Sequence, residues 1–76
     1  MSSREATTRD RERAIARIRA LRAEHARAAQ VFANRAQEAR AAARYSATAR
    51  WTNEYRRSTA SCRLLGEMIR GEVEAA

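Results

Sequence analysis

The residue types that most often carry out chemistry are scarce in this sequence, which has one histidine, His25, and one cysteine, Cys62. A nucleophilic thiol needs a base within hydrogen-bond reach, and a metal ion needs three or four ligands. Helical spacing puts His25 on an apolar stripe, and we expect Cys62 to lie several helical turns away from it. We therefore predict a protein that is not an enzyme and that uses no metal ion, cofactor or small-molecule substrate.

Arginine is the residue type that offers binding chemistry. All sixteen basic residues are arginine, and with nine acidic residues they give the 76-residue chain a net charge of +7. In residues 39–63 six arginines accompany a single acid, Glu54, and the aromatic residues Tyr45, Trp51 and Tyr55 are interleaved. Arginines beside aromatic rings are typical of nucleic-acid and phosphate contact. The predicted phosphate contacts are Arg40, Arg44, Arg50, Arg56, Arg57 and Arg63.

The same arginines have two other interpretations. By helical angle, those of the first predicted helix are spread around its cylinder, as expected for a solvated surface. A positive field also favours an acidic protein surface. A protein partner is therefore our first prediction, and a basic nucleic-acid-associated protein is the alternative.

The element that must position these residues is a long helix. Residues 14–49 contain fifteen alanines, and most of the others are Arg, Glu or Gln, which are strong helix formers. Apolar residues recur at helical spacing from Ile15 to Ala43. We expect a helix over residues 8–46.

A second apolar stripe, from Tyr55 to Ile69, predicts a shorter helix over residues 53–71. Ser, Thr and Asn residues weaken the helix before it, so we expect Thr52 or Asn53 to be its N-cap and Gly71 its C-cap. No Gly or Pro interrupts the joint, and the stripe keeps its helical phase across it. One long continuous helix in an oligomeric coiled coil is therefore the alternative fold.

The two helices predict an all-α fold, an antiparallel, coiled-coil-like helical hairpin. If the chain turns near Ala49, Cys62 lies opposite Ala36, and Leu65 lies opposite Phe32 or Ala33. Large side chains of one helix then meet small ones of the other, which is how two helices interdigitate.

In that register the first helix extends beyond the end of the second. Its apolar residues Ile15, Ile18 and Leu21 then have no partner within the chain. We predict that these three residues, with Phe32, form the interface of a homo-oligomer or bind a protein partner. A chain of this size buries only about 60% of its unfolded surface, which favours association. The predicted function is a non-enzymatic protein–protein interaction or assembly module.

Composition assigns the remaining segments. Residues 1–8 are polar and predicted to be flexible, residues 9–71 form the hairpin domain, and residues 72–76 form a frayed acidic tail. No apolar run approaches the roughly 20 residues of a membrane span, and the N-terminus has no signal-peptide core. We therefore expect a cytoplasmic protein without a membrane span. Arginine without lysine, together with abundant alanine, fits the GC-rich genome of a bacterium or phage.

Overall fold

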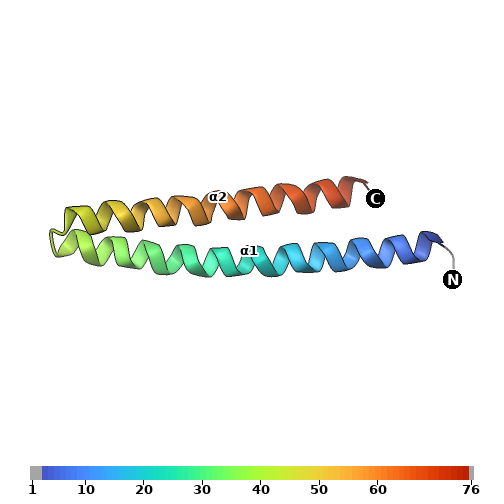
Figure 1. The fold of residues 1–76 in the computed structure, drawn as a ribbon, viewed down its shortest axis with the longest axis horizontal. Coiled ribbons are helices and arrows are strands. Elements are labelled where there is room, and N and C mark those ends of the chain that lie inside the picture. The colour runs from blue at the N-terminus through green and yellow to red at the C-terminus, as the bar shows by residue number, and fades with distance from the viewer. Residues whose placement is uncertain (1–2, 76) are drawn as a thin grey trace.

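The computed structural model describes residues 3–75, which form two helices, α1 (Ser3–Ala41) and α2 (Tyr45–Ala75) (Figure 1). Side chains are described for residues 7–75. The helices lie antiparallel and side by side, in a rod whose Cα atoms extend over 62 × 16 × 11 Å. The predicted all-α hairpin is confirmed, and the chain does not form the alternative single helix.

The turn between the helices consists of Ala42, Ala43 and Arg44. The Arg44 N–H donates a hydrogen bond to the Ala39 carbonyl at 2.8 Å, and the Ala43 N–H donates to the Arg40 carbonyl at 3.0 Å. These are the two hydrogen bonds of a Schellman motif, which requires one residue in the left-handed region. Ala43 fills that position, with a φ of 56°, although glycine is the residue that usually adopts it.

Helix α2 begins directly after this turn. The carbonyl of Arg44 accepts hydrogen bonds from both the backbone N–H and the hydroxyl of Thr48, each at 2.9 Å, so Arg44 is the N-cap. Thr52 and Asn53 lie inside α2 instead of capping it, and Gly71 also lies inside α2 instead of ending it. These predicted caps were wrong.

The predicted helix bounds change accordingly. The joint lies at residues 42–44, so the predicted bounds of 8–46 and 53–71 are wrong there. Residues 3–8 belong to α1 and residues 72–75 belong to α2. The outermost parts of the segments predicted to be flexible or frayed, residues 1–2 and 76, lie outside the described residues.

Three contacts between the helices fix the register, and they join Arg11 to Glu72, Arg22 to Cys62 and Phe32 to Trp51. The Cys62 thiol donates a hydrogen bond to the Arg22 carbonyl at 3.5 Å. The prediction placed Cys62 opposite Ala36, so the predicted register was wrong by fourteen residues on α1. It was wrong because the chain turns earlier than expected.

This register removes the predicted overhang. The Arg11 guanidinium lies 3.8 Å from the Glu72 carboxylate, so α2 reaches back past Ile15, Ile18 and Leu21. Only the first turns of α1, drawn in blue, extend beyond the end of α2 (Figure 1). The three apolar residues therefore lie alongside α2.

Small residues build much of the seam between the helices. Among residues 7–75, the buried ones are Ala29, Ala39 and Ser58, each about 7% exposed, and no large side chain is fully buried. Seam positions alternate at spacings of three and four residues, which is a seven-residue repeat. On α1 they are Ile15, Ile18, Arg22, His25, Ala29, Phe32, Ala36 and Ala39. On α2 they are Thr48, Trp51, Tyr55, Ser58, Cys62, Leu65, Ile69 and Glu72.

Candidate functional site

The four predicted interface residues divide between the seam and the surface. Ile15, Ile18 and Phe32 are half-buried, whereas Leu21 is 46% exposed. Phe32 packs within the hairpin, because its ring stacks on that of Trp51. The role of these four residues in binding a partner stays a prediction, but its original reason, the overhang, no longer applies.

The sequence prediction missed two exposed apolar residues of α2. Leu64 is 60% exposed and Met68 is 53% exposed. They are four residues apart, so they lie one turn from each other on the same side of α2. The sequence indicated them only by their positions next to the seam residues, Leu64 beside Leu65 and Met68 beside Ile69.

The seven-residue repeat places Leu64 on the same face of the rod as Leu21. Arg35 of α1 and Arg50 of α2 line one hollow beside the seam. Leu21 is fourteen residues, or two repeats, before Arg35, so it lies on the same side of α1 as Arg35. Leu64 is two repeats after Arg50, so it lies on the same side of α2 as Arg50. We define the apolar face as Ile18, Leu21, Leu64 and Met68.

Charge is distributed unevenly along the rod. Residues 25–62, the half that contains the turn, carry seven arginines and two acidic residues, a net charge of +5. The rest of the chain carries nine arginines and seven acidic residues, a net charge of +2. The apolar face therefore lies in the half where the charges nearly balance.

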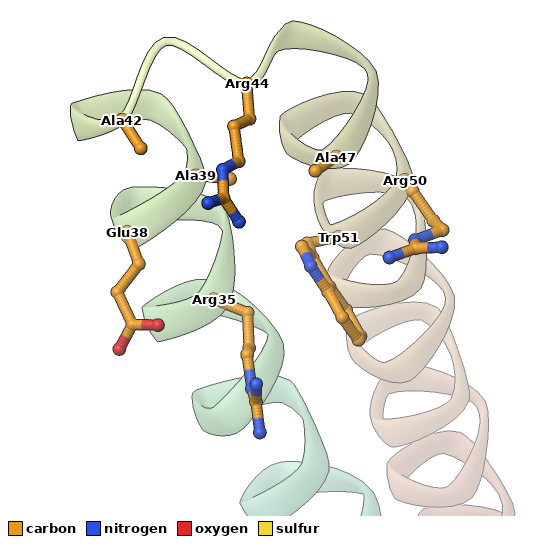
Figure 2. Close-up of a pocket in the computed structure, with 8 residues that line it drawn as sticks. All are labelled: Arg35, Glu38, Ala39, Ala42, Arg44, Ala47, Arg50 and Trp51. Atoms are coloured by element: carbon orange, nitrogen blue, oxygen red, sulfur yellow. The ribbon is translucent and has the colours of Figure 1, made fainter.

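A hollow lies at the turn end, beside the Trp51 ring (Figure 2). Arg35 reaches it from α1, Arg44 from the turn and Arg50 from α2, and Glu38 also lines it. We define the arginine pocket as Arg35, Arg44, Arg50 and Trp51.

The indole ring of Trp51 holds two of these arginines. The Cζ atom of Arg50 lies 5.0 Å from the ring centroid, and that of Arg35 lies 5.7 Å from it. Both distances are within the range of a cation–π interaction. In residues 7–75 none of the three arginines of the pocket forms an ion pair. Their charge is therefore not neutralised by a carboxylate of the described chain.

The structure brings only part of the predicted phosphate contacts together. Arg44 and Arg50 both line the arginine pocket, as does Arg35, which the sequence prediction missed. Arg57 pairs with Glu54 at 3.3 Å. The other three predicted contacts are exposed outside the pocket: Arg40, Arg56 and Arg63.

His25 and Cys62 are closer than predicted. The Cys62 thiol bonds to the carbonyl of Arg22, which is one turn before His25 on α1. The expectation that several turns separate them was therefore wrong. No group of three or more His, Cys, Asp or Glu residues that could hold a metal ion occurs in the described part of the chain.

Neither helix, over the residues described, has an apolar stretch of the length needed to cross a membrane. Comparison of the chain with models of protein families, with characterised proteins and with solved structures found no match.

Proposed function

We propose that this protein is a non-enzymatic assembly module in which two copies pack through their apolar faces into a four-helix bundle. The observation that carries the proposal is the exposure of Leu21, Leu64 and Met68 on one face, at 46%, 60% and 53%. A hairpin with no fully buried large side chain in its described part has a small core. A second hairpin would cover the face and enlarge that core.

The energetics favour weak association. Full burial of an exposed Leu or Met side chain stabilises by roughly 1.5–3 kcal/mol, so burial of the exposed halves of six such side chains in two copies gives about 5–9 kcal/mol. Association itself costs about 4–15 kcal/mol of translational and rotational freedom. The two terms are similar, so we expect a dimer that forms at high protein concentration.

Charge favours a second copy in an antiparallel arrangement. The apolar face lies in the half of the chain with a net charge of +2, so two copies repel each other little there. A two-fold axis across this face would put the two turn ends, each at +5, at opposite ends of the bundle. This arrangement separates the strongest like charges.

Light scattering coupled to size-exclusion chromatography tests the proposal. We expect wild-type protein to elute at twice the chain mass of 8.6 kDa, and the double variant Leu64→Ser, Met68→Ser to elute as a monomer. These two residues are a cleaner choice than Ile18, because Ile18 also belongs to the seam of the hairpin.

The matched control is the double variant Tyr45→Ser, Val73→Ser. Both residues are exposed, at 80% and 55%, and they are four seven-residue repeats apart on the side of α2 that lies across the seam from the apolar face. We expect this variant to remain a dimer, with circular dichroism confirming helix in all proteins. A monomeric wild type at high micromolar concentration, or an equal loss of mass in both variants, would contradict the proposal.

A further inference from the structure

We propose that the arginine pocket binds phosphate groups of a nucleic-acid backbone through Arg35, Arg44 and Arg50. The pocket is on the same side of the rod as the apolar face but nearer the turn, because Arg50 is fourteen residues, or about 21 Å along α2, from Leu64. The inference uses none of the residues of the apolar face, and it does not rest on the assembly proposed above.

The first argument is geometric. Arg35 and Arg50 lie over the Trp51 ring at 5.7 and 5.0 Å. A cation–π contact uses none of the N–H donors of the guanidinium, so these stay available for oxygen acceptors. The contact also limits the freedom of the side chain, so less entropy is lost when a phosphate binds. Arg44 adds a third guanidinium from the turn (Figure 2).

The second argument is electrostatic. None of the three guanidiniums has an ion-pair partner in residues 7–75, and Glu38 is the one acidic residue that lines the hollow. The surrounding residues 25–62 carry a net charge of +5. Such a field attracts phosphates and releases the counterions condensed on a nucleic acid.

The third argument selects a polymer over a small anion. Three further exposed arginines lie along α2 beyond the pocket: Arg56, Arg57 and Arg63. Arg57 follows Arg50 by seven residues and keeps its side of α2, where it pairs with Glu54, whereas Arg56 and Arg63 lie on the adjoining outer side. A helix rises 1.5 Å per residue, so these arginines extend over about 20 Å beyond Arg50. An isolated phosphate would use the pocket alone, whereas a nucleic-acid backbone also presents phosphates to Arg56 and Arg63.

The mode of binding is contact with the backbone. The Trp51 ring already stacks on Phe32 at 5.7 Å and carries two guanidiniums, so it is not offered to a base. Phosphate contacts carry no direct sequence information. We therefore expect binding that is independent of sequence and strongly dependent on salt.

Trp51 is the only tryptophan of the chain, so its fluorescence reports on the pocket. The experiment is a titration of the protein with a mixed-sequence DNA duplex of about 20 base pairs, at about 50 and 200 mM salt. We expect a saturable change in Trp51 emission. Neutralising three phosphates predicts a slope of about −2.7 in log affinity against log salt, which is about forty-fold weaker binding at the higher salt.

Two triple variants of equal net charge distinguish binding at the arginine pocket from general electrostatic attraction to the protein. One is Arg35→Gln, Arg44→Gln, Arg50→Gln. The other removes three exposed arginines near the opposite end of the rod, by Arg13→Gln, Arg17→Gln and Arg70→Gln. We expect the first to weaken duplex binding at least tenfold and to make the salt slope shallower, and the second to weaken binding less than threefold. Circular dichroism verifies that both remain helical.

Three results would overturn the proposal. The first is an absence of duplex binding by the wild-type protein at the lower salt. The second is an equal loss in the two triple variants, which would leave only general charge attraction. The third is saturable binding of inorganic tripolyphosphate, used as the small-anion probe, without binding of the duplex.

Discussion

Phe32 of α1 and Trp51 of α2 stack across the seam, with ring centroids 5.7 Å apart and an angle of 21° between the ring planes. The neighbouring seam residues toward the turn are small, Ala36 and Ala39 on α1 and Thr48 on α2. Stacked aromatic pairs contribute about 0.5–1.5 kcal/mol beyond the burial of their area. The pair therefore holds the turn half of the hairpin together, and it also positions the indole ring on which the arginine pocket is built.

Replacement of Phe32 by alanine should destabilise the hairpin. A fully buried Phe→Ala change costs about 3–5 kcal/mol; because Phe32 is only half-buried, we expect a loss of about 2 kcal/mol. The measurement is urea unfolding followed by circular dichroism at one protein concentration. Val31→Ala, at the adjacent exposed position, is the control and should change the stability by less than about 0.5 kcal/mol. Equal effects of the two changes would show that the stack contributes little.

Ala43→Gly should stabilise the protein. A non-glycine residue in the left-handed region is strained by about 1–2 kcal/mol, and Ala43 has a φ of 56°. Glycine relieves this strain but adds about 0.4–1 kcal/mol of unfolded-state entropy, so we expect a net gain of about 0.5 kcal/mol in thermal or urea unfolding.

Ala42→Gly is the matched control for that change. Ala42 is the preceding residue of the same turn, and its φ is not positive. Glycine there adds unfolded-state entropy without relieving strain, so we expect a loss of about 0.5–1 kcal/mol. A gain of stability in Ala43→Gly together with a loss in Ala42→Gly would locate the left-handed residue of the turn at Ala43. A loss of stability in both variants would contradict this location.

The hairpin was predictable from the sequence, but its register was not. Alanine and arginine content predicted helices, and the apolar stripes predicted which sides face each other. The error of fourteen residues is two complete seven-residue repeats, so the same stripes face each other in both registers. The pattern therefore could not distinguish a turn near Ala49 from one at Ala43.

The sequence of the turn gives little indication that the chain reverses direction there. Ala42, Ala43 and Arg44 include none of the residues that usually end or begin helices, whereas Thr52 and Asn53 are good N-cap residues. The Schellman motif forms there despite the strain on Ala43. Because the turn was misplaced, no sequence argument could bring Arg35 beside Trp51, and so the arginine pocket was only partly predicted.

Gly71→Ala should stabilise α2. A Cβ atom at Gly71 would meet nothing within 4 Å, and alanine is favoured over glycine inside a helix by about 0.5–1 kcal/mol. Because Gly71 is near the end of α2, we expect about 0.5 kcal/mol. Gly66→Ala should gain less stability than the higher helix propensity of alanine alone would give. The new Cβ would lie 3.3 Å from the Arg22 Cζ atom, so the guanidinium must move. Thermal unfolding at fixed concentration compares the two, and a loss of stability in Gly71→Ala would contradict the helical conformation at that position.

The melting temperature of the wild-type protein should rise with its concentration, because unfolding of a dimer also dissociates it. A tenfold increase in concentration is worth about 1.4 kcal/mol per dimer, which corresponds to a rise of about 3–6 °C for an assembly of this size. The variant Leu64→Ser, Met68→Ser should lose this dependence, since its apolar face no longer holds a second copy. Tyr45→Ser, Val73→Ser should keep it, because those two residues, although exposed, lie across the seam from that face. A melting temperature of the wild type that does not change with concentration would mean that the hairpin is stable alone, and that Leu21, Leu64 and Met68 stay exposed in solution.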